Sequence, residues 1–282
     1  MLMTDPEAVS LADSELQSLT NFACQLADLA GNTIMPYFRQ ELSVDNKLSG
    51  GSFDPVTVAD KEAELRMREQ IQSSHPGHGI LGEEYGAVQG ETGLTWVLDP
   101  IDGTRAFISG LPVWGTLIAL HDGQRPVIGV MDQPFTGERF IASGNRSVLQ
   151  QHGREKILQT RACNKLDQTI MMSTDPEMFD RSERRVQQQL ASSVKLMRFG
   201  GDCYAYCMLA SGCIDLVVEA GLSAYDIQAL IPIIECAGGV VSDWQGNPAD
   251  SGGQVVAASN LKLHAQALEL LAPAAKKSAS IL

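Results

Sequence analysis

Hydrophobic side chains recur at helical spacing near the start of the chain. From Ser14 onward, leucine, phenylalanine and alanine return at the spacing of one helix face, and the pattern stops near Pro36. This predicts an amphipathic helix that Ser14 and Gln17 begin with a capping box. A polar, glycine-rich stretch follows around residues 45–52, and a second helix is predicted over residues 60–73.

The pattern then changes to short apolar runs separated by turn residues. These runs predict an antiparallel meander with strands at residues 95–98, 114–120, 127–131 and 139–142. After about Lys156, strand-like and helix-like segments alternate, which is typical of an α/β arrangement. The alternating segments are residues 170–173, 180–191, 203–211, 214–218, 225–237, 239–243, 255–258 and 261–271.

This change near residue 157 predicts two lobes. We expect an N-terminal α+β lobe with an antiparallel sheet in residues 1–157 and a C-terminal α/β lobe in residues 158–282. A chain of 282 residues is long enough for one large domain or for two that share a cleft. Residues 276–282 are short and mostly small or polar, so they are predicted to be a frayed tail without function.

Composition limits the classes of partner. The chain has 34 acidic against 21 basic residues and a formal charge of −13, a field that repels nucleic acid and anionic membranes. No segment offers the ~20 apolar residues of a membrane helix. No basic residue precedes Arg39, which argues against a secretion signal or a transit peptide. We therefore expect a cytoplasmic protein that binds neither nucleic acid nor membranes.

The cysteines do not indicate a disulfide framework. Six are spread along a long chain without a secretion signal, which favours reduced thiols. Cys203, Cys207 and Cys213 lie near one another, but Cys-x-x-Cys pairs and a nearby histidine are missing. We interpret them as buried small hydrophobic residues rather than zinc ligands.

Asp99 and Asp102 offer the most informative chemistry. Asp99 ends an apolar run, and Pro100 then forces an extended turn that presents Asp102 close to it. Gly103 and Thr104 follow. Mg²⁺ is usually held by a few carboxylates together with water and substrate phosphate. The alternative is an ordinary acidic turn in which Asp102 caps a helix, and an isolated pair of aspartates would favour that alternative.

Other acidic motifs add weight to the metal-site interpretation. Gly82-Glu83-Glu84 precedes the turn, Asp60 opens an earlier helix, and Asp226 follows in the motif Ala224-Tyr225-Asp226. The motifs GEE and WVLDPIDGT, with a late YD ahead of a helix that leads into AGG, resemble the inositol monophosphatase family of Mg²⁺- and Li⁺-sensitive phosphatases. The resemblance extends from about residue 47 to residue 258. It implies a layered α-β-α-β-α sandwich of the inositol monophosphatase and fructose bisphosphatase type, a homodimer, and a small phosphorylated metabolite as substrate.

The resemblance also implies a set of metal ligands. Glu83, Asp99 and the backbone carbonyl of Ile101 would hold one metal ion, and Asp99, Asp102 and Asp226 a second, so that Asp99 bridges the two. A third, weaker ion is implied near Asp60 and Glu83. With two or three Mg²⁺ ions, hydrolysis would proceed by in-line attack of a metal-activated water, without a covalent phosphoenzyme.

Further catalytic roles follow from the same resemblance. Asp60 would pair with Thr104 to orient the attacking water, with Glu83 as the third catalytic residue. Asp60 could instead cap its helix, and the two roles can coexist. Gly103 and Thr104 would begin a helix whose N–H groups hold phosphate oxygens. Lys47 matches a family position near the metals, although such a residue is more often a solvated lysine.

Two segments indicate which ester is cut. Residues 105–110 and the motif GGDCYAY at residues 200–206, together with residues 222–226, resemble the histidinol-phosphatase branch of the family. Asp202 beside Glu219 would suit a cationic leaving group such as that of L-histidinol phosphate. Asp202 could instead cap the helix predicted to begin at Cys203, and we weigh the two interpretations equally. Arg105 could bind phosphate or pair with a nearby carboxylate.

The sequence therefore predicts a Mg²⁺-dependent phosphomonoesterase that acts on L-histidinol phosphate in histidine biosynthesis. An inositol 1-phosphate phosphatase or a broad sugar or nucleotide monophosphatase is the alternative with the same catalytic set. A non-catalytic Mg²⁺-binding scaffold is the alternative from another class. The residues expected to bind substrate are Gly103, Thr104, Arg105, Gly201, Asp202, Cys203, Glu219 and Asp226.

Overall fold

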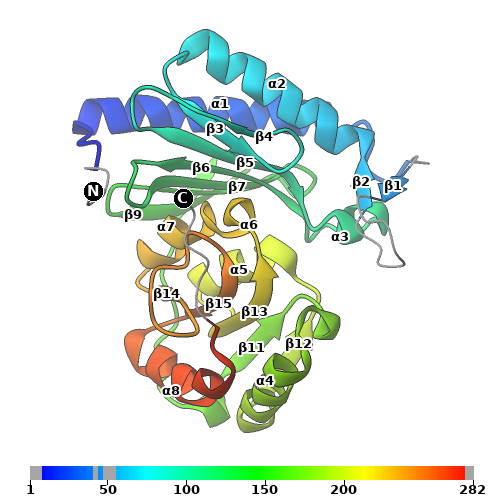
Figure 1. Ribbon diagram of the computed structural model, residues 1–282, viewed down its shortest axis with the longest axis vertical. Helices are drawn as coiled ribbons and strands as arrows, with labels where there is room; N and C mark the ends of the chain where they lie inside the picture. Colours follow the sequence, from blue (N-terminus) through cyan, green and yellow to red (C-terminus); the bar gives the residue numbers. More distant parts are fainter. Residues whose placement is uncertain (1–7, 41–43, 47–54, 277–282) are drawn as a thin grey trace, which may run out of the picture.

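The structure is a computed structural model that describes residues 8–40, 44–46 and 55–276 (Figure 1). Its α-helices are α1 (Asp13–Ile34), α2 (Val58–Ser74), α3 (Thr104–Ile108), α4 (Arg181–Ser193), α5 (Asp202–Ala210), α6 (Ala224–Ile227), α7 (Leu230–Glu235) and α8 (Leu261–Leu271). The strands are β1 (Val44–Asn46), β2 (Pro55–Thr57), β3 (Gly79–Gly82), β4 (Gly86–Val88), β5 (Thr95–Asp102), β6 (Gly115–His121), β7 (Pro126–Gln133), β8 (Glu138–Ser143), β9 (Arg146–Gln151), β10 (Arg154–Ile157), β11 (Ile170–Ser173), β12 (Leu196–Phe199), β13 (Leu216–Leu222), β14 (Val240–Asp243) and β15 (Gly253–Ala258). Short 3₁₀ turns lie at Leu166–Gln168, Pro176–Met178 and Ala272–Ala274.

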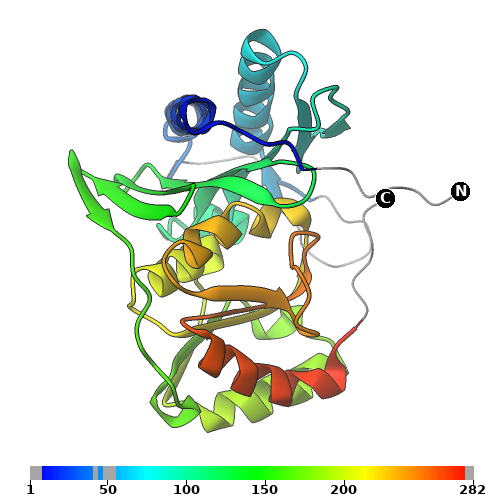
Figure 2. The ribbon, with the colours of Figure 1, turned by 90° about the vertical axis from the view of Figure 1, so that its left-hand side faces the viewer.

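Helices and sheets alternate in layers. α1 and α2 cover one face of an eight-stranded sheet, and α5, α6 and α7 lie between its other face and a five-stranded sheet (Figure 1, Figure 2). α4 and α8 cover the outer face of the second sheet. The order is α-β-α-β-α, as predicted, and it gives the apolar face of each helix a sheet to pack against.

The first sheet contains the predicted meander. Strands β5 to β10 follow one another as antiparallel neighbours, while β3 pairs parallel to β5 on the other side. α1 lies over this sheet, and Leu19, Leu26 and Ile34 on its inner face are buried. The predicted capping box is wrong, because the helix begins at Asp13 and its N-cap is Ala12. Ser14 therefore lies within the first turn.

The second sheet has the strand order β12-β11-β13-β15-β14. One apolar cluster joins it to the first sheet, because residues of β5 to β8 and of the middle helices share the same core. α7 approaches β7 so closely that a Cβ on Gly129 would lie 2.0 Å from Ala229 O. The division into domains at residues 157 and 158 stays a prediction, although the first sheet ends at residue 157 and the second begins at residue 170.

The helix predicted over residues 225–237 is divided into α6 and α7. Pro232 lies in the first turn of α7, where its missing N–H group costs no hydrogen bond; in the middle of one longer helix it would remove one. Ala229, which makes the close contact with Gly129 of β7, is the N-cap residue of α7.

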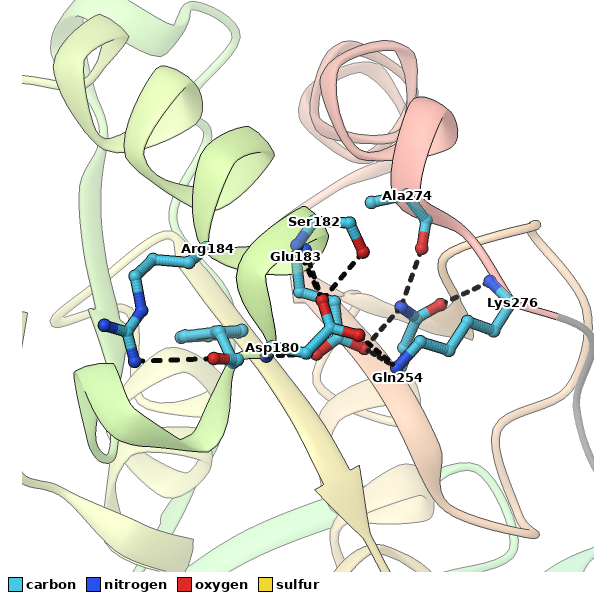
Figure 3. A network of polar contacts seen from close by, with 8 residues as sticks. Asp180, Ser182, Glu183, Arg184, Gln254, Ala274 and Lys276 are labelled. Carbon is cyan, nitrogen blue, oxygen red and sulfur yellow. Dashed lines mark hydrogen bonds and ion pairs between the residues drawn. The ribbon is translucent and has the colours of Figure 1, made fainter.

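The chain near its C-terminus is fastened to the start of α4 (Figure 3). Gln254 Nε2 of β15 donates to Glu183 Oε1 at 2.8 Å and to Ala274 O at 2.9 Å, and Gln254 Oε1 accepts from Lys276 N at 2.7 Å. Lys276 Nζ pairs with Asp180 Oδ2 at 2.9 Å and with Glu183 Oε1 at 2.6 Å. Lys276 is thus held, contrary to the predicted frayed tail; residues 277–282 lie outside the described part.

We expect Gln254→Ala to lower the free energy of unfolding by about 1–3 kcal/mol, because it removes the bond to buried Glu183 and both bonds to the C-terminal segment. Urea denaturation measures the change. Gln188→Ala, on the exposed face of α4, is the matched control and should change stability by less than about 0.5 kcal/mol. Equal effects of the two variants would contradict a stabilising role for the network.

Candidate active site

A bulge in β5 brings Asp99 and Asp102 together. The strand was predicted to end at Leu98, but it continues to Asp102, and its pairing with β6 shifts register between the two aspartates. In a regular strand, residues three apart point to opposite faces, whereas an extra residue in one strand re-aims the side chains. Both aspartates consequently line one cavity.

Local hydrogen bonds fix the turn that contains the two aspartates. Ile101 N donates to Asp99 Oδ1 at 3.0 Å, and Thr116 Oγ1 of β6 donates to Pro100 O at 2.8 Å. From the helical layer between the two sheets, Cys203 N at the start of α5 donates to Asp102 Oδ2 at 2.6 Å. Asp102 does not cap a helix; the residue before α3 is Gly103, with a left-handed φ of 85° that favours glycine.

Asp226 enters the site from α6, where it is part of a capping box. Ser223 N donates to Asp226 Oδ2 at 2.7 Å. Asp60 is held in the same way on α2, because Thr57 N donates to Asp60 Oδ2 at 2.8 Å. Both are therefore third residues of their helices rather than N-caps, and the backbone fixes one oxygen of each.

Three carboxylates form a cluster suited to a divalent cation. Asp99, Asp102 and Asp226 each offer an oxygen, and these atoms all lie within 4.8 Å of one another. Burial, followed by the charges of neighbouring acids, raises the pKa of Asp99 and of Asp102 well above the usual range. Such a cluster has the oxygen donors that hard cations prefer, and a bound cation would relieve the repulsion between the acids.

Glu83 lines the same cavity from the turn after β3. Glu83 N donates to Leu98 O at 3.2 Å, which ties this turn to β5 next to Asp99. The negative charge of Glu83 is one cause of the raised Asp99 pKa, after burial. The structure thus brings Glu83, Asp99, Ile101, Asp102 and Asp226 together around one cavity. Their role as metal ligands stays a prediction.

Asp60 lies beside this group but does not line the cavity. The residue is 1% exposed, and its Oδ1 has no hydrogen-bond partner within the described residues. Burial raises the pKa of Asp60 to about 7, opposed by the hydrogen bonds from Thr57. Thr104 Oγ1 donates to Ile101 O at 3.2 Å, and no direct bond joins it to Asp60 in this part of the chain. Their joint role toward water stays a prediction.

The cavity measures about 450 Å³. Its lining comes from both parts of the chain: Glu83, Asp99, Ile101, Asp102, Gly103, Thr104, Arg105, Thr174, Asp175, Met178, Asp202, Ala220, Gly221, Leu222, Ser223, Tyr225 and Asp226. Arg105 is the one basic residue among these, and its Nη1 pairs with Asp175 Oδ2 at 2.9 Å. Lys47 lies outside the described residues.

Known proteins match almost the whole chain. The model of the inositol monophosphatase family matches residues 15–280. The chain is 41% identical over 273 residues to the bifunctional phosphatase IMPL2 of Arabidopsis thaliana, covering 93% of this chain and 77% of that protein. The chain belongs to the inositol monophosphatase family.

Two further relatives bear on function. A histidinol-phosphatase of Chlorobaculum parvum is 33% identical over 239 residues, covering 84% of this chain and 90% of its own length. The solved structure of an inositol monophosphatase from Zymomonas mobilis has a TM-score of 0.81 and 38% identity, and the match covers 91% of this chain and 98% of that one. The inositol monophosphatase fold is thereby confirmed, as is the reaction class of a phosphomonoesterase hydrolase.

Membership in the family bears on the acidic cluster. The inositol monophosphatase family depends on metal ions, which suits the acidic cluster. Among the described residues, no helix is both long enough and apolar enough to cross a membrane.

Asp202 has an uncommon backbone conformation for a residue other than glycine. It begins α5 with φ 43°, in the left-handed region, and lines the cavity. A left-handed non-glycine residue is costly and often marks a functional position. The predicted capping role is wrong, because the N-cap is Gly201 and no side-chain bond caps α5. Burial raises the pKa of Asp202 to about 6, although Arg105 opposes the shift.

Glu219 does not reach the cavity, contrary to the prediction that it contacts substrate. Its side chain is fully enclosed, where Oε1 accepts from Thr174 N at 2.8 Å and Oε2 accepts from Tyr206 OH at 2.9 Å. Thr174 Oγ1 in turn accepts from Asp202 N at 3.1 Å. Glu219 therefore acts on the cavity wall through Thr174. Gly201 and Cys203 also fall outside the lining.

Sequence reasoning missed Thr174, Asp175 and Met178, which line the cavity from the connection between β11 and α4. They belong to no recognisable motif. One signal was available in the alternation of strand-like and helix-like segments, which is typical of parallel strands. β11 and β13 do pair in parallel, and ligands bind beyond the carboxyl ends of parallel strands. The segment directly after Ser173 could thus have been expected beside Asp226.

The buried Glu219 generates a prediction about pH. Burial raises its pKa from an ordinary value of 4.5 to about 7. Between these values the folded state binds more protons than the unfolded state, so the free energy of unfolding should fall as the pH rises from 4.5 to 7. Glu219→Gln keeps an acceptor for Thr174 and should lessen this fall by up to about 3 kcal/mol. Urea denaturation of both proteins at several pH values measures it, and parallel curves would contradict it.

Proposed function

We propose that this chain is a Mg²⁺-dependent phosphomonoesterase whose preferred substrate is L-histidinol phosphate. Two or three cations would be held by carboxylates and one carbonyl at the cavity: Glu83, Asp99, Asp102, Asp226 and the Ile101 carbonyl. Bound divalent cations supply an acidified water and neutralise charge on phosphate oxygens. A homodimer and a cytoplasmic location stay predictions.

The chain's own groups have defined tasks in this proposal. Thr57 N and Ser223 N fix one oxygen each of Asp60 and Asp226, so the other oxygen of each keeps a set direction. Asp60 Oδ1, which has no partner in the described interior, would accept a hydrogen bond from the attacking water. Gly103 and Thr104 line the cavity at the start of α3, and their N–H groups would orient the phosphate group.

Two further aspartates beside the cluster support the substrate proposal. Asp202 and Asp175 line the cavity, and Arg105 pairs with Asp175 at 2.9 Å. An amino-alcohol ester carries a cation that a carboxylate binds by a charge-assisted hydrogen bond, whereas inositol is neutral. The strained backbone of Asp202 supports a role in recognition. A relative named histidinol-phosphatase agrees with this choice.

An inositol phosphatase is the second candidate. The 38% identity to an inositol monophosphatase from Zymomonas mobilis favours it, and the same acidic group would serve both reactions. A broader sugar or nucleotide monophosphatase would also use that group. The convergence of Asp99, Asp102 and Asp226, with Glu83 in the lining of the same cavity, argues against the non-catalytic scaffold.

We expect phosphate release from L-histidinol phosphate with Mg²⁺, and Asp99→Asn should lower kcat/KM by at least about 100-fold because it removes a shared carboxylate. Phosphate is measured with L-histidinol phosphate, inositol 1-phosphate and a 3′-phosphonucleotide, each with and without Mg²⁺. Asp167→Asn, an exposed aspartate, is the matched control and should keep full activity. Equal or faster turnover of inositol 1-phosphate would overturn the substrate proposal. Full activity of Asp99→Asn would revive the scaffold.

Asp202→Asn separates recognition from chemistry. Asparagine tolerates the left-handed backbone but has no charge, so we expect KM for L-histidinol phosphate to rise about 10-fold with a smaller change in kcat. Inositol 1-phosphate is the internal control, and its KM should change by less than about twofold if only the cation contact is lost. A uniform loss with both esters would show that Asp202 acts on the whole site.

A further inference from the structure

A buried ion pair on α2 lies directly behind the turn that carries Glu83. Glu64 Oε1 accepts from Arg68 Nε at 2.7 Å, and the two side chains are 0% and 7% exposed. The glutamate also accepts from the backbone of the turn, with Glu84 N at 2.7 Å from Oε2 and Tyr85 N at 3.1 Å from Oε1. Two successive N–H groups of the turn therefore donate to one carboxylate.

Arg68 completes the hold on this turn. Its Nη2 donates to Gly86 O, so the pair binds the backbone of three consecutive residues, 84–86. The arginine also balances the charge of Glu64, which would otherwise add to the negative charge of Glu83, Asp99 and Asp60. A buried carboxylate that is paired in this way keeps its acceptor geometry.

The glycine of the GEE motif makes the close contact possible. A Cβ on Gly82 would lie 2.1 Å from Glu64 Oε1 and 2.7 Å from Arg68 Nη2. Either distance would force the ion pair away from the turn. The sequence Gly82-Glu83-Glu84 thus combines a ligand residue with the space that its supporting pair requires.

Glu83 is held from two sides. Its own N–H donates to Leu98 O of β5, next to Asp99, while the residues that follow it are bound by Glu64. Glu64 lies one helical turn after Asp60 on α2 and is, like Asp60, buried. One helix face therefore sets both Asp60 and the turn that carries Glu83.

We propose that Glu64, together with Arg68, is a positioning residue that sets Glu83 for cation binding. The inference rests on the proposed function in one respect, that Glu83 holds a divalent cation. Neither side chain lines the cavity, so neither contacts substrate. Residues that orient a metal-binding carboxylate typically change metal affinity by about 10- to 100-fold when they are replaced.

The test measures cation binding directly, apart from turnover. In Glu64→Gln, one acceptor oxygen becomes an NH₂ group that opposes a donor, so we expect the dissociation constant for Mn²⁺, measured by electron paramagnetic resonance, to rise about 10- to 100-fold. We expect kcat at saturating Mg²⁺ to return to within about threefold of the original value, since the ligands themselves remain. If Glu64→Gln does not fold, the same Mn²⁺ titration is made with Arg68→Gln, which removes the bonds from Nε and Nη2. We expect the dissociation constant to rise in this variant too.

Asp215→Asn is the matched control. Asp215 is also a fully buried carboxylate, which accepts from Arg161 Nε at 2.8 Å and from Ile170 N at 2.7 Å. It precedes β13, at the opposite end of that strand from Ser223, so this variant should lose stability while binding Mn²⁺ with unchanged affinity. Unchanged affinity in folded Glu64→Gln, or an equal loss in Asp215→Asn, would overturn the inference. If the unaltered protein binds Mn²⁺ but hydrolyses no ester, the proposed function fails while this comparison still decides the role of Glu64.

Discussion

Mutual repulsion among closely spaced carboxylates is the constraint that the site depends on. Asp99, Asp102 and Asp226 approach within 4.8 Å in a site where burial already disfavours charge. The fold opposes this cost with backbone donors: Cys203 N holds Asp102 and Ser223 N holds Asp226. Helix starts are suited to this task because their first N–H groups have no partner within the helix.

The same constraint links the first sheet to the helices that separate it from the second sheet. Asp102 belongs to β5 of the first sheet, yet its donor is the first turn of α5, which packs on the second. A Cβ on Gly103 would lie 2.9 Å from Asp202 Cγ, so glycine permits the contact between the two parts. The cavity therefore exists only when both parts are docked, which links stability to the integrity of the site.

Support for the site extends well beyond its lining. The Glu64–Arg68 pair holds one wall through the backbone of residues 84–86, and buried Glu219 holds another through Thr174. On the far side, Lys276 and Gln254 fasten the start of α4, whose preceding segment contributes Asp175 (Figure 3). In the first two cases a buried side chain binds backbone groups, and in the third the bonds to α4 join side chains. All three leave the cavity carboxylates available to ligands.

Local patterns, namely helical spacing and the WVLDPIDGT and GEE motifs, were enough to predict the family and the layered fold, and both are confirmed. The same motifs contain acidic residues that line the cavity. The sequence also indicated Asp60 and Asp226, whose helices begin with local capping boxes. Tertiary structure alone decided that Glu219 is enclosed, that Asp202 is strained rather than a cap, and that Asp175 pairs with Arg105. Those outcomes depend on contacts between segments dozens of residues apart, and no local pattern of residues encodes such contacts.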